Sequence, residues 1–170
     1  MLNFKLQYMN SKFKYLFLLA ALLFIYNACV KKKTYSQNPE IEYKTFTPYL
    51  YPNGDSAIMV IGFADGNGDI GKDVGDTTLN LFMTYYYKDS ITQKYMAYYD
   101  PFFSDTVRNG YTIRKPNDSY NGKPISGEVS VRINKYRHSK KIKDLKYIIY
   151  MFDNAGNKSN ILSTPVLIVP

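Results

Sequence analysis

Short runs of residues that suit β-strands, separated by residues that favour turns, are the feature that most restricts how this chain can fold. The clearest run covers residues 127–134, where Val129, Val131 and Ile133 alternate with polar side chains. Successive side chains of a strand point to opposite faces of a sheet, so these three are expected to face a core. No stretch after residue 40 has a convincing helical period, and the sequence therefore predicts an all-β domain.

Seven further segments are expected to form strands on the same grounds. Residues 56–64 are apolar on both faces, which predicts a strand in the middle of a sheet with cover on each side. The other segments are residues 41–47, 79–88, 94–99, 111–114, 145–152 and 161–169, with a hairpin turn at residues 89–93. Short strands separated by turns in a chain of this size predict a β-sandwich.

The N-terminus has the three zones of an export signal in the required order. A basic zone with three lysines and no acidic residue precedes an uncharged run of eleven residues, YLFLLAALLFI, at residues 15–25. Eleven residues match a signal-peptide core and fall short of the roughly 20 that a membrane-spanning helix needs. We therefore expect residues 1–28 to be a cleaved signal peptide; the alternative is a buried core helix beside an incidental cysteine.

Cys29, the only cysteine, stands where a lipoprotein signal peptidase would cut. The residues before it, Tyr26, Asn27 and Ala28, resemble a lipobox loosely, because the typical pattern has leucine at the first position and small residues at the other two. A covalent lipid on Cys29 would anchor the protein firmly, since each buried methylene contributes about 0.8 kcal/mol. Residues 29–40 are polar and are expected to form a lipidated tether to a domain at residues 41–170, which then contains no thiol.

The formal net charge of +8 falls by three when the signal lysines are removed, so the basic balance of the exported chain is mild. An exported protein meets little nucleic acid, and we expect no nucleic-acid partner. The most basic segment is either a soluble hairpin tip or a contact for an anionic envelope polymer such as lipopolysaccharide or phospholipid. Its candidate contact residues are Arg132, Lys135, Arg137, Lys140, Lys141 and Lys143.

Three glycines at residues 66, 68 and 71 spell G-x-G-x-x-G after a predicted strand. Dinucleotide binding also requires a helix to begin there, so that its N-terminal amides receive the pyrophosphate. The segment that follows contains a glycine and two aspartates, which would repel phosphate, and shows no helical pattern. The dinucleotide interpretation is therefore rejected.

The same loop is rich in oxygen ligands, because Asp65, Asn67 and Asp69 occupy alternate positions. Hard cations such as calcium prefer carboxylate and amide oxygens. Asp73 and Asp76 fall at the ninth and twelfth positions of an EF-hand count, although isoleucine stands at the sixth, where that loop needs glycine. The five residues are candidate ligands for calcium; the alternative is a turn in which aspartate and asparagine bond their own backbone.

Catalytic groups are scarce. The single histidine, His138, lies among cations, and no carboxylate is closer in sequence than Asp144. A nucleophile needs a base that is held by a third group, so a solvated hairpin tip explains this histidine better than a catalytic triad. We expect no enzyme activity.

The predicted hairpin is rich in tyrosine. These side chains either pack in the core or form an exposed binding face, and they are Tyr85, Tyr86, Tyr87, Tyr95, Tyr98 and Tyr99.

Two short motifs resemble segments of known proteins. Residues 63–71, F-x-D-G-x-G-D-I-G, are similar to a stretch that recurs in small bacterial envelope lipoproteins of unknown function. Residues 153–159, D-x-A-G-N-x-S, resemble the end of immunoglobulin-like and fibronectin-III-like domains in bacterial envelope proteins. The resemblance implies an immunoglobulin-like β-sandwich of seven to eight strands and implies no activity.

These observations together predict an outer-membrane lipoprotein that acts as a binding or structural module of the cell envelope. Its expected partner is an envelope protein or a glycan, and the alternative functions are a carbohydrate-binding or envelope-assembly accessory and, third, a hydrolase. Lysines directly after Cys29, where surface-directing signals place acidic residues, favour the periplasmic face.

Overall fold

A computed structural model describes Tyr15 and residues 34–51, 55–102, 104–115, 122–136, 138–139 and 141–169. The chain divides into two units, Met1–Lys33 and Thr34–Pro170. The expected signal peptide, apart from Tyr15, and Cys29 lie outside the described residues. Residues 34–40, which the sequence pattern assigns to the tether, belong to the second unit. Within the described part of the chain, no helix has the length and apolar character needed to cross a membrane.

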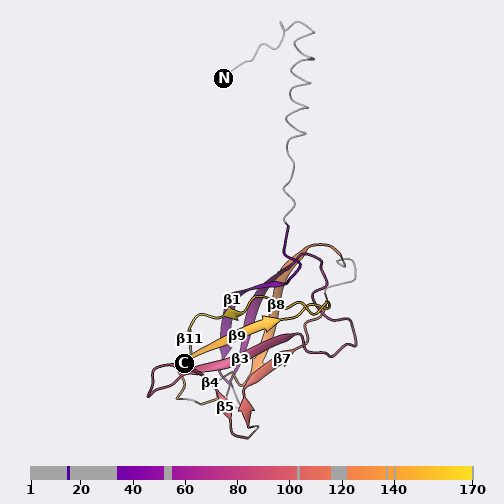
Figure 1. The fold of residues 1–170 in the computed structure, drawn as a ribbon. Helices are drawn as coiled ribbons and strands as arrows, with labels where there is room; N and C mark the ends of the chain where they lie inside the picture. The colour runs from indigo at the N-terminus through magenta and orange to yellow at the C-terminus, as the bar shows by residue number, and fades with distance from the viewer. Residues whose placement is uncertain are drawn as a thin grey trace, which may run out of the picture. The chain divides into compact units, whose positions relative to one another are not determined.

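The second unit is built from antiparallel strands, as predicted, and forms a β-sandwich (Figure 1). Its described residues form eleven strand segments, more than the seven to eight expected. The segments expected at residues 94–99 and 161–169 are each split in two, the short strand Asp105–Thr106 was not predicted, and the strand expected at residues 111–114 is found at Arg108–Tyr111. In chain order they are β1 (Glu40–Tyr49), β2 (Ser56–Asp65), β3 (Leu81–Lys88), β4 (Tyr95–Ala97), β5 (Tyr99–Asp100), β6 (Asp105–Thr106), β7 (Arg108–Tyr111), β8 (Ile125–Asn134), β9 (Asp144–Met151), β10 (Leu162–Ser163) and β11 (Leu167–Ile168).

The first sheet has three strands in the order β1-β2-β8, so β1 is an edge strand and β2 is central, as predicted. Val131 and Ile133 of β8 are buried and Val129 is half-buried, while Glu128, Ser130 and Arg132 are exposed, which confirms the alternation predicted from the sequence. The outward residues of β2, Ile58 and Val60, are only half-buried. The second face of β2 therefore lacks the full cover that its apolar sequence predicts.

The second sheet has the order β10-β9-β3-β4, with β7 also paired to β3 and β11 also paired to β9. Strands β3 and β4 form the predicted hairpin, closed by a hydrogen bond of 2.9 Å from the Asp89 amide to the Lys94 carbonyl. The expected last strand is interrupted because Pro165 has no amide to donate. Thr164 compensates there, since its hydroxyl oxygen accepts a hydrogen bond of 3.0 Å from the Tyr147 amide.

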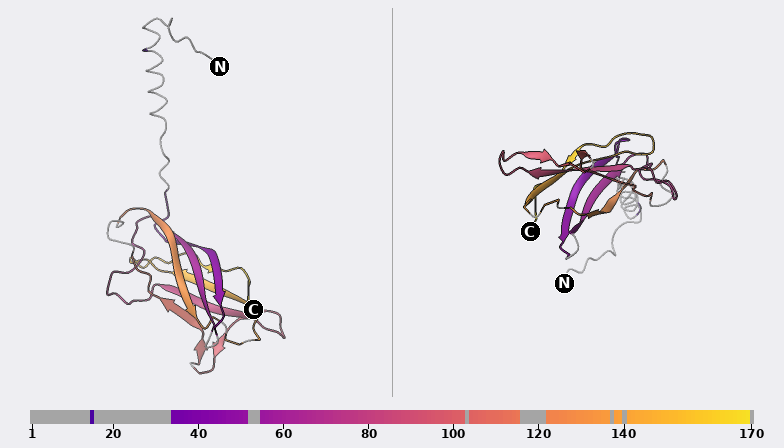
Figure 2. Two further views of the ribbon diagram at one scale, coloured as in Figure 1. Left: turned by 180° about the vertical axis from the view of Figure 1, so that it is seen from behind. Right: turned by 90° about the horizontal axis from the view of Figure 1, so that it is seen from below.

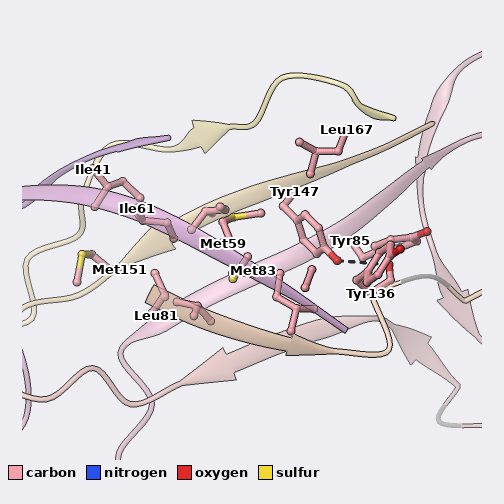
Figure 3. Close-up of a cluster of buried hydrophobic side chains, with 14 of the residues drawn as sticks. Ile41, Met59, Ile61, Leu81, Met83, Tyr85, Tyr136, Tyr147, Met151 and Leu167 are labelled. Atoms are coloured by element: carbon pink, nitrogen blue, oxygen red, sulfur yellow. Dashed lines mark hydrogen bonds between the residues drawn. The ribbon is translucent and has the colours of Figure 1, made fainter. Parts of the chain in front are cut away.

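The inner faces of the two sheets enclose one core, and Figure 2 shows the strands of one sheet crossing over those of the other. Met59 and Ile61 of the first sheet pack with Met83 and Ile149 of the second, and all four are completely buried. Three buried tyrosine side chains gather at one end of this core (Figure 3), namely those of Tyr85, Tyr136 and Tyr147. The ring centres of Tyr85 and Tyr147 are 5.6 Å apart, and the Tyr147 hydroxyl donates to the Tyr136 carbonyl at 3.5 Å.

Candidate metal centre

At one end of the sandwich, the loop after β2 lies against the turn after β9. The Asn154 amide donates to the Asp69 carbonyl at 3.2 Å, and the Asn154 side chain donates to the Gly71 carbonyl at 2.7 Å. The Ala155 amide donates to Oδ2 of Asp69 at 3.2 Å. These bonds join the two motifs that the sequence analysis singled out, although more than eighty residues separate them.

Three carboxylates meet where the two segments touch. Asp65, Asp69 and Asp153 each place an oxygen within 4.8 Å of the others. The relative exposure of Asp65 is 0% and that of Asp153 is 2%, while Asp69 is half-buried. Burial of several carboxylates together is costly unless hydrogen bonds or a counter-charge compensate it.

The loop leaves a set of oxygens without partners. Oδ2 of Asp65 accepts a hydrogen bond of 3.2 Å from the Ile70 amide, but its Oδ1 has no partner. The other buried side-chain oxygens of the loop without a partner are Oδ1 of Asn67 and Oδ1 of Asp69. Alternate residues of the loop therefore each contribute one buried oxygen without a hydrogen bond, at positions 65, 67 and 69.

Asp153 is held firmly by its own turn. Its Oδ1 accepts from the Asn157 amide at 2.7 Å, and its Oδ2 accepts from the Asn157 side chain at 2.8 Å. Gly156 permits this turn by adopting a φ of 86°. The sequence analysis did not include Asp153 among the ligands, and the signal that points to it is the D-x-A-G-N motif itself.

Electrostatic repulsion accompanies the clustering. Burial raises the pKa of Asp65 above its ordinary value, and the negative charge of Asp69 adds to this effect, with a smaller contribution from Asp153. Hydrogen bonds from backbone amides oppose the rise only in part. The ion pairs found among the described residues, Lys44–Glu42 and Lys115–Asp73, leave the three clustered carboxylates without a cationic side chain.

The structure does not bring Asp73 and Asp76 to this cluster. Asp73 is exposed and forms an ion pair of 2.6 Å with Lys115. Oδ1 of Asp76 accepts from the Thr78 amide at 2.8 Å, and the hydrogen bonds from Thr78 lower the pKa of Asp76. The Arg114 guanidinium donates to the backbone carbonyls of both aspartates. Of the five predicted ligands, the structure thus gathers Asp65 and Asp69 and adds Asp153, while Oδ1 of Asn67, between them in sequence, is buried without a partner.

The other candidate residues lie elsewhere in the unit. Arg132 projects from the outer face of β8, and Lys135, Lys141 and Lys143 are exposed beyond that strand, whereas Arg137 and Lys140 lie outside the described residues. His138 stacks on Tyr98 with 4.6 Å between ring centres. Burial, together with the charge of Lys135, lowers the pKa of this histidine.

Comparison of the chain with protein-family models, with curated proteins and with solved structures found no match.

Proposed function

We propose that this protein is an exported, lipid-anchored β-sandwich that acts as a non-catalytic binding module of the cell envelope. The zones of residues 1–28 and the position of Cys29 support export and acylation. The described residues provide a sandwich with a closed core, which can present a surface to a partner without further domains.

We further propose that the sandwich is immunoglobulin-like. The first sheet follows the order β1-β2-β8 and the second the order β10-β9-β3-β4. This pairing corresponds to strands A-B-E facing strands G-F-C-C′ of the immunoglobulin-like class. Folds of that class host many unrelated binding functions, so the function has to be argued from the surface.

The observation that supports a binding role best is the outer face of the second sheet. Alternation along β3 and β9 turns Phe82, Tyr86, Tyr150 and Phe152 away from the core, where they are only partly buried. The rings of Phe82 and Tyr150 are stacked with 5.3 Å between their centres, and Phe152 contacts both edge to face. We call these four residues and Tyr95 of β4 the aromatic face.

The first sheet presents a different outer surface. Its outward residues are charged on the two outer strands, at Glu42, Lys44, Glu128 and Arg132, and aliphatic on β2, at Ile58 and Val60. Partly exposed aromatic rings in mutual contact are enriched where proteins bind partners, because each ring offers a large rigid apolar area at low entropic cost. The difference between the two faces favours the aromatic face as the contact surface.

A glycan is the partner that this chemistry favours. Lysine ammonium groups lie over two of the rings, Lys158 at 4.1 Å from the ring centre of Tyr150 and Lys146 at 4.3 Å from that of Tyr95. Rings suit the apolar faces of sugars, and the neighbouring ammonium groups suit hydroxyl or acidic substituents. An accessory role in envelope assembly, with a protein partner on the same face, is the second candidate.

Hydrolysis has less support in the arrangement of side chains. The ring of His138 packs against the rings of Tyr98 and Tyr85, with 4.9 Å between the ring centres of His138 and Tyr85. A histidine that acts as a base needs a partner to orient it and a free nitrogen near a nucleophile. The stacking of this ring favours a packing role.

The experiment measures binding of the full chain, purified in detergent, to peptidoglycan sacculi, lipopolysaccharide and a glycan array. We expect binding to at least one envelope glycan, and we expect the double variant Tyr150→Ser with Phe82→Ser to bind at least about tenfold more weakly, because two central rings are lost. The matched control is Tyr49→Ser with Tyr51→Ser, which removes another stacked pair outside this face, 6.4 Å between ring centres. Equal loss in both double variants, or no glycan binding by the wild type, would contradict the glycan proposal.

A further inference from the structure

We propose that Asp65, Asn67, Asp69 and Asp153 form a binding site for one calcium ion, which links the loop after β2 to the turn after β9. The site lies next to the aromatic face, because Phe152 directly precedes Asp153, but it needs neither that face nor the lipid anchor to bind calcium. It differs from the set predicted by sequence, because it takes its fourth ligand from the far end of the chain and omits the two exposed aspartates.

The free oxygens are the first reason. Buried polar atoms in folded proteins almost always have a hydrogen-bond partner, and an exception calls for an explanation. Here the Oδ1 atoms of Asp65, Asn67 and Asp69 are all buried without a partner, within the five residues that run from the end of β2 into the loop. Oδ2 of Asp65 and Oδ2 of Asp69 are meanwhile fixed by backbone amides, so each carboxylate is oriented with one oxygen held and the other free. A bound cation accounts for all three free oxygens at once.

The dimensions of the cluster are the second reason. Calcium binds oxygens at about 2.3–2.6 Å, so ligands on opposite sides of the ion are roughly 4.6–5.2 Å apart. The carboxylate oxygens of Asp65, Asp69 and Asp153 lie within 4.8 Å of one another, which fits that span. Magnesium usually keeps several water ligands and binds through one or two carboxylates, so a set of three carboxylates and one amide oxygen favours calcium.

The charge balance is the third reason. Three carboxylates meet in a largely buried position, and the donors found around them are backbone amides and the side chain of Asn157. A divalent cation offsets most of this repulsion and replaces the water that the oxygens have lost. Asn67 adds a neutral oxygen, and water molecules would complete the six to eight ligands that calcium takes.

The position of the site indicates what the ion would do. The loop after β2 is already bonded to the turn after β9 through Asn154 and Ala155. An ion shared by Asp65 and Asp69 on one side and Asp153 on the other would close this end of the sandwich. Calcium would therefore stabilise the fold by mass action, since the unfolded chain does not hold these residues together.

The test uses the full chain in detergent, freed of metal with chelator, and measures bound calcium by equilibrium dialysis with elemental analysis. We expect about one calcium per chain at roughly 1 mM free calcium, at the weak end of the range for extracellular sites, and a melting temperature several degrees higher than in chelator. Magnesium at the same concentration should produce a smaller rise. Binding well below one ion per chain at that concentration would overturn the proposal.

Variants locate the site. Asp69→Asn and Asp153→Asn keep the shape of the side chain but remove its charge, and we expect each to weaken calcium binding at least about tenfold. Asp73→Asn and Asp76→Asn are matched controls, because both are exposed aspartates nearby whose carboxylates point elsewhere. If Asp153→Asn fails to fold, Asn67→Ala provides the second variant and should also bind more weakly. Unchanged affinity in the folded cluster variants, or equal loss in the controls, would overturn the assignment.

Discussion

Replacing Gly66 with alanine tests the packing of the segment that leads into the sandwich. A Cβ atom at this position would lie 2.5 Å from the Tyr35 carbonyl oxygen and 2.6 Å from that of Ser36. Both are backbone atoms, so they cannot rotate away, and the segment that contains them has to move. Gly66 is not among the glycines with positive φ, so the cost arises from this overlap and not from a left-handed conformation.

The contacts that the segment would lose set the magnitude. The Gly66 amide donates to the Ser36 carbonyl at 2.7 Å, and the Tyr35 hydroxyl donates to Oγ of Ser126 at 3.0 Å. A hydrogen bond contributes about 0.5–1.5 kcal/mol net, so detaching the segment costs about 1–3 kcal/mol. For a domain of this size the melting temperature should fall by about 4–12 °C.

Gly62→Ala is the matched control. A Cβ atom there would lie 2.7 Å from Cε of Lys44 and 2.9 Å from Cγ of Glu42, which belong to exposed, flexible side chains. These side chains can turn aside, so we expect a change within about 0.5 kcal/mol. Urea denaturation gives both free energies, and limited proteolysis should cut Gly66→Ala faster near Tyr35. The reasoning is refuted if Gly62→Ala destabilises the protein as much as Gly66→Ala.

Two further substitutions test other contacts. Asn160→Ala removes two hydrogen bonds between the Asn160 side chain and the backbone of Ile41, at 2.7 and 2.9 Å. The substitution should lower the free energy of unfolding, measured by urea denaturation, by about 1–3 kcal/mol. A loss below about 0.5 kcal/mol would contradict a stabilising role for these two bonds. Burial and Lys135 lower the pKa of His138 despite the opposing charge of Asp100, so the folded state binds this proton less tightly than the unfolded chain. The free energy of unfolding should therefore fall as the pH drops below about 6.5, the pKa of histidine in the unfolded chain. The contribution of His138 to this fall ends once the pH is below the lowered pKa of the folded state. His138→Gln should make thermal melts between pH 8 and 5 less pH-dependent than wild type, and identical pH profiles would contradict this.

The sequence was most informative where a strand has one buried face or is wholly apolar. Residues 127–134 and the hairpin through residues 89–93 follow from local periodicity and turn residues, which the tertiary structure reinforces. The pattern at residues 161–169 predicts one strand, but Pro165 removes a donor in the middle, and Thr164 bonds the neighbouring strand through its side chain instead. The partial exposure of the outer face of β2 could not be predicted either, because an apolar sequence does not indicate whether another layer covers that face.

The proposed calcium site depends partly on local sequence and partly on the tertiary fold. The alternation of Asp65, Asn67 and Asp69 is local, and it was enough to single out the three side chains that each leave one buried oxygen without a partner. Counting further along an EF-hand adds Asp73, but the chain turns away at Gly71, whose φ is 94°, and the Lys72 amide then donates to the Ile113 carbonyl at 2.8 Å. The fourth proposed ligand, Asp153, lies in a turn near the far end of the chain, and its contact with this loop is set by the sandwich and not by local sequence.

Intact-mass analysis of the protein isolated from native membranes tests the anchoring on which the envelope role depends. We predict a chain that begins at Cys29, lacks residues 1–28 and carries fatty acyl groups on its first residue. A chain that retains residues 1–28 and carries no fatty acid would contradict the role proposed here.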